Sequence, residues 1–177
     1  MSKKWNTFDV LRHSRHDWLN RLQLIKGNLA LDHVDRAKEI IEEIIIQSRQ
    51  EAKLSNLNAP KLAEYILTFN WCNHLFQLDF EVIGDEYDIC TYEADLIELI
   101  AQCTAVLDSQ VNVPADHHLL LTLQLYHEEI HLVFDFQGEV SDQNKLKLAF
   151  ENPEVKSAKL IELEQTEQEL VSTFLIK

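Results

Sequence analysis

Two long amphipathic helical patterns occupy the first 55 residues of the chain. In the first, from about Thr7 to Leu31, apolar residues recur at intervals of three and four once Arg15 is counted as an interruption: Leu11, Trp18, Leu22, Ile25 and Leu29. The second pattern runs from Val34 to about Ser55, and we expect Asp32 to act as its N-cap. A helix of about 25 residues is about 37 Å long at about 1.5 Å per residue. A hairpin of this length cannot bury its own apolar stripe, so the stripe must pack against something else.

A second copy of the hairpin is the simplest partner for that stripe. Two hairpins related by a two-fold axis form a four-helix bundle, and closed symmetric dimers are the commonest oligomers. We therefore expect a homodimer. Packing of the stripe against the C-terminal part of the same chain is the alternative.

The rest of the chain shows mixed helical and strand patterns. Asn56 to Pro60 form a boundary, because Asn and Pro favour turns and the residue before Pro leaves helical geometry. A helix to about Asn73 and a strand from Phe76 to Val82 follow. Further elements are expected at Tyr92–Ser109 (helix), His118–Tyr126 and Ile130–Phe136 (strands joined by a turn at 127–129), Asp142–Phe150 (short helix), Ala158–Leu163 and Leu170–Ile176 (strands). We predict two domains: a helical hairpin at 1–58, and an α+β domain at 59–177 with helices on one face of a mainly antiparallel sheet.

The composition fits a folded protein and argues against several classes. Of the 177 residues, 46% are hydrophobic and 26% charged, which is enough for a buried core. No stretch approaches the roughly 18 apolar residues that span a bilayer, and the first ten residues lack a signal-peptide core, so we expect a cytoplasmic protein that does not enter a membrane. The three cysteines, Cys72, Cys90 and Cys103, show no CxxC spacing and are expected to be reduced.

Charge is distributed unevenly along the chain. Residues 1–60 carry ten Lys and Arg against eight Asp and Glu, a net of +2, whereas residues 61–177 carry six against twenty-two, a net of −16. The acidic second part argues against nucleic-acid binding, which requires clustered cations. Before Asp32, six cations face only two carboxylates, so this part of the chain can receive an acidic partner or a phosphoryl group. The six are Lys3, Lys4, Arg12, Arg15, Arg21 and Lys26.

His16 points away from the apolar stripe of the first helix. On a wheel that advances about 100° per residue, the stripe lies about 180° to 240° from His16. The residues within about 60° of His16 are polar or small: Arg12, His13, Asn20, Gln23 and Gly27. An exposed imidazole is a good nucleophile because its ordinary pKa, about 6.5, leaves much of it unprotonated near neutral pH. A merely solvated surface histidine is the alternative.

His13 and His16 are three residues apart on one helical face, so both can reach one metal ion. No convincing third ligand accompanies them, and Arg12 and Arg15 would repel a cation. We therefore expect no metal site here. The remaining six histidines form no constellation that indicates a site.

The segment LRHSRHDWLNRLQLIKGNL at residues 11–29 closely resembles the sporulation initiation phosphotransferase B family of spore-forming bacilli. Its core, His16-Asp17-x-x-Asn20, is similar to the phosphoacceptor box that this family shares with a subgroup of two-component sensor kinases. The stretches KLSNL at 53–57 and LTFNW at 67–71 are similar too. The close resemblance covers residues 11–71, and the remainder agrees in length and in its α+β pattern.

The resemblance implies both a fold and a function. The implied fold is a dimeric four-helix bundle with a protruding histidine, joined to a C-terminal domain shaped like a degenerate histidine-kinase ATPase domain. The implied function is phosphoryl transfer in the sporulation phosphorelay, from the aspartyl phosphate of one response-regulator receiver domain to the aspartate of a second, with His16 as the phosphoacceptor. Because a receiver domain brings its own acidic pocket and Mg²⁺, the chain would need no metal or cofactor of its own.

The positions of the residues around His16 on the helix suggest a role for each of them. Arg12 and Arg15 are candidates for offsetting phosphoryl charge or docking an acidic receiver, with solvated surface charge as the alternative. Asn20, one turn on, can hydrogen-bond the ring or the phosphate. Gln23 and Gly27 extend the docking surface, and the missing side chain at Gly27 would let a partner's backbone come close.

Asp17 is harder to assign. It lies about 100° from His16 on the wheel, so an ion pair with Arg21 at i+4 explains it as well as a catalytic role does.

The glycine count argues against kinase activity. Histidine kinases close their ATP site with glycine-rich boxes, whereas only Gly84 and Gly138 follow Gly27 in this chain. The stretch Asp135 to Gly138 resembles such a box only weakly. We therefore expect no autophosphorylation from ATP. A non-catalytic dimeric adaptor and a degenerate kinase scaffold that binds a receiver domain are the alternative functions.

Overall fold

The computed structural model describes residues 5–111, 116–127 and 129–177. Lys3 and Lys4, counted above with the basic start of the chain, lie outside the described residues, as does Glu128 in the expected turn. The chain divides into two compact units, residues 1–49 and 50–177. Each unit is described by itself.

The first unit is a helical hairpin of α1 (Thr7–Ala30) and α2 (Val34–Ser55), whose last residues belong to the second unit. Asn6 and Asp9 cap the start of α1 reciprocally. Asn6 Oδ1 accepts the Asp9 N–H at 3.0 Å, and Asn6 Nδ2 donates to Asp9 Oδ2 at 2.6 Å. Both helices lie where the apolar periodicity predicts them.

The prediction that Asp32 caps α2 is wrong. Asp32 has a φ of 59°, in the left-handed region, and it helps to end α1. The His33 N–H donates to the Asn28 carbonyl at 2.8 Å, and the His33 carbonyl accepts the first bond of α2 from the Ala37 N–H at 3.1 Å. Aspartate tolerates the left-handed conformation better than most residues, which suits it to this turn as well as to an N-cap.

The hairpin leaves its apolar stripe largely open within the single chain. No residue of α1 is fully buried, and Trp18 and Leu22 are 49% and 55% exposed. In the part of α2 that belongs to this unit, Ala37 and Ile40 are buried, whereas Ile41 and Ile46 are exposed. The expectation that a hairpin of this length cannot close its own core is confirmed.

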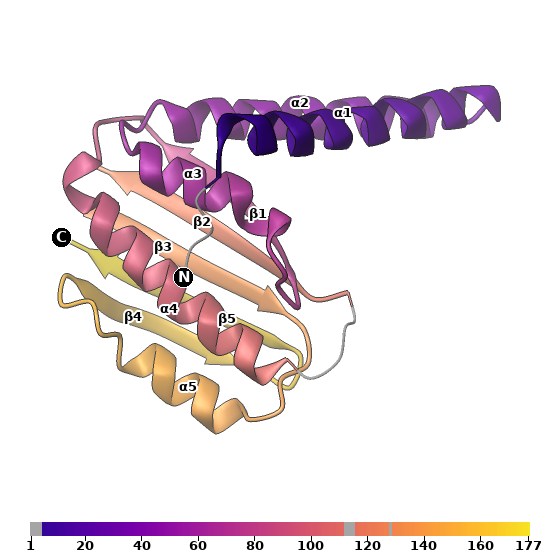
Figure 1. Ribbon diagram of the computed structural model, residues 1–177. Helices are drawn as coiled ribbons and strands as arrows, with labels where there is room; N and C mark the ends of the chain where they lie inside the picture. Colours follow the sequence, from indigo (N-terminus) through magenta and orange to yellow (C-terminus); the bar gives the residue numbers. More distant parts are fainter. Residues whose placement is uncertain (1–4, 112–115, 128) are drawn as a thin grey trace. The chain divides into compact units, whose positions relative to one another are not determined.

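The second unit is a five-stranded mixed sheet with helices on one face, as Figure 1 shows for α3, α4 and α5. The strand order is β1-β2-β3-β5-β4, with β1 parallel to β2 and the other pairs antiparallel. Its elements are α3 (Pro60–Thr68), η1 (Phe69–Trp71), β1 (Gln77–Gly84), η2 (Cys90–Tyr92), α4 (Glu93–Gln110), β2 (His118–Tyr126), β3 (Glu129–Gln137), α5 (Gln143–Glu151), β4 (Ala158–Gln165) and β5 (Glu169–Ile176). The predicted α+β fold class is confirmed.

The core lies between the sheet and its helices. Alternate residues of the two central strands are at most 5% exposed and face the helical layer: Leu119, Leu121, Leu123 and Leu125 on β2, and Ile130, Leu132, Phe134 and Phe136 on β3. Helix α4 contributes Leu96, Leu99, Ile100 and Leu107, all at 0% exposure. The alternating apolar residues that predicted these strands are therefore the residues that face the core, and the residues between them lie on the other face of the sheet.

Candidate functional site: the His16 face of α1

All the residues singled out as site candidates lie on α1, between Arg12 and Gly27. His16 is near the middle of the helix, and its side chain is 72% exposed. The wheel prediction that the imidazole points to solvent is therefore confirmed. A rigid helix holds the ring while leaving it accessible to another macromolecule.

Two neighbouring side chains approach the same nitrogen of His16. Asn20 Nδ2 lies 3.2 Å from His16 Nδ1, and Asp17 Oδ1 lies 3.4 Å from it. Within the residues that the structure describes, no hydrogen bond reaches Nε2. The Asn20 contact requires a lone pair on Nδ1 and the Asp17 contact requires a proton there, so each contact is a hydrogen bond in one tautomer of the ring. Both contacts leave Nε2 on the open side.

Asp17 is nearer to the His16 ring than its wheel angle suggests. The wheel places Cα–Cβ directions, whereas Asp17 and His16 are adjacent in the chain and their side chains bend together across the helix surface. Arg21, the expected ion-pair partner of Asp17, donates to Gln47 Oε1 on α2 at 2.5 Å and so links the two helices of the hairpin.

The remaining candidates are exposed along the same helix. Arg12, Arg15, Gln23 and Gly27 are all exposed, and among the described residues no hydrogen bond or ion pair joins either arginine to His16. A Cβ placed on Gly27 would meet no atom within 4 Å, so the fold of the chain itself does not require glycine there. These positions present an open surface beside the imidazole.

His13 packs against Trp5. The two rings are 5.1 Å apart, centroid to centroid, in an edge-to-face arrangement. In the described part of the chain, no group of three or more His, Cys, Asp or Glu side chains is arranged to hold a metal ion.

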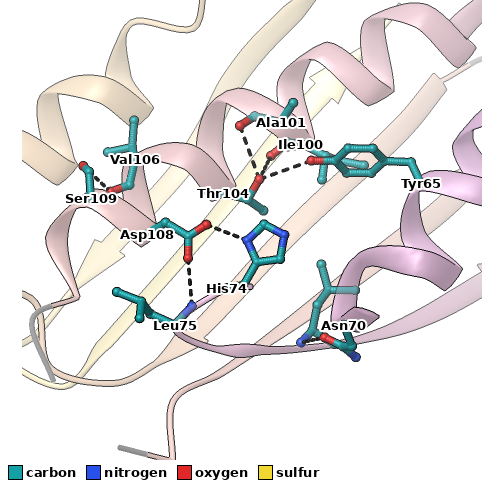
Figure 2. Close-up of polar contacts among 11 residues, drawn as sticks. Tyr65, Asn70, His74, Leu75, Ile100, Ala101, Thr104, Val106, Asp108 and Ser109 are labelled. Atoms are coloured by element: carbon teal, nitrogen blue, oxygen red, sulfur yellow. Dashed lines mark hydrogen bonds and ion pairs between the residues drawn. The ribbon is translucent and has the colours of Figure 1, made fainter. Parts of the chain in front are cut away.

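Sequence reasoning missed a histidine–aspartate pair in the second unit. His74 Nδ1 lies 2.6 Å from Asp108 Oδ2, and Asp108 Oδ1 accepts the Leu75 N–H at 3.0 Å (Figure 2). The His74 ring also stacks on Phe69, with centroids 3.8 Å apart and planes 7° apart. Burial, with a smaller contribution from Asp108, raises the pKa of nearby Tyr65. The contact was not expected, because no sequence signal links two residues 34 positions apart.

The pair has a structural role. Asp108 is on α4, and its carboxylate ties that helix to the connection that leads into β1. His74 and Asp108 are only 22% and 26% exposed, in contrast to His16.

None of the helices in the described ranges is long and apolar enough to cross a membrane.

Comparison with known proteins accounts for both parts of the chain. A family model described as the alpha-helical domain of the Sensor_kinase_SpoOB type matches residues 1–57. A second, described as sporulation initiation phospho-transferase B, C-terminal, matches residues 58–177. Among curated proteins, the chain is 44% identical over 135 residues to sporulation initiation phosphotransferase B of Bacillus subtilis (strain 168), covering 75% of this chain and 70% of that protein.

Solved structures with detectable similarity are more distant. A blue-light-activated histidine kinase of Erythrobacter litoralis matches with 12% identity and a TM-score of 0.48, covering 99% of this chain and 61% of that one. The histidine kinase ThkA, solved in complex with the response regulator TrrA, matches with 12% identity and a TM-score of 0.41, covering 95% and 60%. A bacterial phosphotransferase matches with 13% identity and a TM-score of 0.40, covering 97% and 98%. The two family models and the curated relative establish that the chain belongs to the sporulation initiation phosphotransferase B family.

Proposed function

We propose that the chain is a phosphorelay phosphotransferase that carries the phosphoryl group on His16. The donor is the aspartyl phosphate of one response-regulator receiver domain, and the acceptor is the aspartate of a second. The observation that carries the proposal is an exposed imidazole held through Nδ1, with Nε2 directed away from its contacts. Partners of this class would place the reaction in the cytoplasm.

The proposed reaction is two in-line displacements at phosphorus. In the first, the Nε2 lone pair of His16 forms the N–P bond while the P–O bond to the donor's carboxylate breaks, and the carboxylate leaves with the electron pair. In the second, a carboxylate oxygen of the acceptor attacks phosphorus and the N–P bond breaks, which returns the lone pair to Nε2. The metal ion in this scheme is Mg²⁺ held by the receiver domain, and His16 supplies only the nucleophile.

Asp17 and Asn20 set the state of the ring in this proposal. Asp17 accepts the Nδ1 proton, which selects the tautomer whose lone pair is on Nε2, and its charge stabilises the imidazolium that forms on phosphorylation. Asn20 Nδ2 is a donor and cannot hydrogen-bond a protonated Nδ1, so in this tautomer Asn20 is available to the phosphoryl group instead. Arg12 and Arg15 offset charge on the phosphoryl oxygens or dock the receiver, and Gln23 and Gly27 extend the docking surface.

We further propose that the chain does not phosphorylate itself from ATP. The two glycines of the second unit are accounted for by its packing. Gly84 has a φ of 100°, and a Cβ there would collide with the Leu125 carbonyl. A Cβ on Gly138 would collide with the His117 ring, and Asp135 lies within the regular strand β3. At both positions packing explains the glycine, which supports the proposal that neither glycine belongs to an ATP-binding box.

The open apolar stripe supports a homodimer built through a four-helix bundle. Large apolar side chains of α1 and α2 are roughly half exposed in the single chain. Packing two hairpins together would remove this surface from water, which is favourable by about 25 cal/mol per Å². A dimer would also present two His16 faces.

The test is transfer of radiolabel from a phosphorylated receiver domain to the purified chain, comparing wild type with His16→Gln. We expect label on wild type alone, labile in acid and stable in base, as an N–P bond requires. Transfer to His16→Gln would contradict the assignment of His16. If no label moves although the receiver binds, the chain is an adaptor, and if ATP labels it directly, it is a kinase.

A further inference from the structure

The Arg21 side chain is turned toward α2 instead of the nearest carboxylate of its own helix. Arg21 Nη2 donates to Gln47 Oε1 at 2.5 Å. Asp17 comes one turn before Arg21, and this order of an acidic and a basic residue favours an ion pair on a helix. Among the described residues, however, no ion pair joins the two side chains, and Asp17 Oδ1 lies 3.4 Å from His16 Nδ1.

The groove between α1 and α2 explains why Arg21 contacts an amide. This groove has a volume of about 270 Å³, and Arg21, Arg36, Glu43 and Gln47 are among the residues that line it. Arg36 Nη1 donates to Glu39 Oε2 at 2.8 Å and to Glu43 Oε1 at 3.4 Å. These two carboxylates of α2 are therefore engaged by Arg36. Gln47, one turn after Glu43, offers Arg21 a neutral oxygen, so the positive charge of Arg21 keeps its attraction for a carboxylate.

The position of Arg21 bears on the tautomer of the His16 ring. While Arg21 is held by Gln47, the Asp17 carboxylate can accept the Nδ1 proton, and the ring lone pair is then on Nε2. If Arg21 turned to Asp17, the guanidinium would compete with the ring for the carboxylate oxygens. Asn20 Nδ2, 3.2 Å from Nδ1, would then favour the other tautomer, in which Nε2 carries the proton and has no lone pair for phosphorus.

We propose that Gln47 is a positioning residue for phosphoryl transfer at His16. By holding Arg21 on α2, Gln47 keeps the Asp17 carboxylate beside the ring and favours the tautomer that can attack through Nε2. The effect on the transfer rate rests on the proposed function, whereas the effect on the ring does not. A residue of α2 that touches neither the ring nor the phosphoryl group thus influences the chemistry on α1.

The bond between Arg21 and Gln47 also ties the two helices together, and removing each partner in turn separates this role from positioning. A tie is lost equally whichever partner is removed. Positioning predicts opposite results, because loss of Gln47 releases a guanidinium that competes for Asp17, whereas loss of Arg21 removes the competitor itself.

The test measures the ring tautomer and the transfer rate on the full chain. Ring ¹⁵N chemical shifts at pH 8 report which nitrogen carries the proton, and the His16 signals are those absent from His16→Gln. In Gln47→Ala, we expect the ratio of Nδ1–H to Nε2–H tautomer to fall about twofold, the shift that an i, i+4 ion pair can supply. Single-turnover transfer of label from a phosphorylated receiver domain should slow by a similar factor.

Three further variants complete the test. Arg21→Met alone should keep the wild-type tautomer and rate. The double variant Gln47→Ala, Arg21→Met should restore what Gln47→Ala loses. Gln47→Glu is the matched control, because it retains an acceptor for Arg21, and it should behave as wild type.

Four outcomes are decisive. Equal losses in Gln47→Ala and Arg21→Met would make the bond a structural tie and overturn the positioning role. An unchanged tautomer in Gln47→Ala would overturn it as well, even if transfer slows. A shifted tautomer with an unchanged rate would overturn the influence of α2 on transfer. A wild-type chain that accepts no label would refute the proposed function, and the ring signals would still decide whether Gln47 controls the tautomer.

Discussion

At the scale of single residues, the two contacts to His16 Nδ1 assign different tasks to Asp17 and Asn20. Only Asp17 can accept the Nδ1 proton and balance a positive ring. We predict that Asp17→Asn lowers the single-turnover rate of label transfer from a phosphorylated receiver by about tenfold to a hundredfold, the range seen when a histidine that binds a metal loses the partner that orients its ring. Asp9→Asn, a carboxylate change near the start of the same helix, should leave the rate unchanged. An undiminished rate in Asp17→Asn would give Asp17 a structural role.

A second residue prediction concerns thiol reactivity. The hydrogen bond to Asp88 raises the pKa of Cys90, so less thiolate is present at pH 8 than in an unhindered cysteine. Asp88→Asn removes that effect, the Cys90 pKa falls, and alkylation by iodoacetamide at pH 8 should become faster. Mass spectrometry can measure this, with exposed Cys72 in the same molecule as the reference. A constant ratio of Cys90 to Cys72 labelling in the variant would contradict the prediction.

Side-chain contacts were most predictable where the partners are one helical turn apart in sequence. His16 and Asn20 are one helical turn apart, so the helical period places them on one face, whereas the Asp17 contact was not predicted because its wheel angle lies about 100° from His16. The hydrogen-bond partners of the His74 ring and of the Val82 N–H lie 34 and 32 positions away, respectively. Only the packing of α4 and α2 against the rest of the second unit brings these groups together.

At the scale of the helix, a substitution at Gly27 has separate expected effects on helix stability and on docking of a receiver domain. Glycine inside a helix costs up to about 1 kcal/mol relative to alanine, and a Cβ at Gly27 meets nothing within 4 Å. Gly27→Ala should therefore raise the thermal unfolding temperature. If a receiver backbone approaches this position, the same variant should transfer phosphoryl groups more slowly. Ser14→Ala, which also improves helix propensity but lies off the His16 face, should stabilise the chain without slowing transfer.

Equal transfer rates in the two alanine variants would remove Gly27 from the docking surface. A fall in stability of Gly27→Ala would instead point to a close contact at this position.

The apolar periodicity predicted where the helices and strands lie more accurately than it predicted how they begin and end. Helix α2 spans Val34–Ser55, as predicted, because its apolar repeat is long. The turn before it was misread, because Asp favours both an N-cap and a left-handed position, and the sequence does not show which backbone group needs it. The parallel pairing of β1 with β2 was also beyond prediction, since alternation identifies a buried face and leaves the strand neighbour open.

At the scale of the whole molecule, the net negative charge of each chain opposes dimerisation, whereas burial of the apolar stripe favours it. The homodimer proposed here brings together two chains that each carry a net charge of −14. Their repulsion is screened by salt, because the Debye length falls from about 30 Å at 0.01 M to about 8 Å at 0.15 M. We therefore predict that dimerisation tightens as NaCl is raised through this range, measured by sedimentation velocity at several protein concentrations.

The matched variants Leu22→Glu and Leu148→Glu test where the dimer forms. The two leucines are similarly exposed, at 55% and 60%, but Leu22 is on the α1 stripe and Leu148 is on α5. A charge at Leu22 would be buried in the proposed bundle without a partner, so Leu22→Glu should be monomeric at concentrations where Leu148→Glu remains dimeric. Loss of the dimer in both variants would point to a general charge effect. A wild-type chain that is monomeric at every salt concentration would refute the four-helix bundle, and phosphoryl transfer would then have to proceed on a single hairpin.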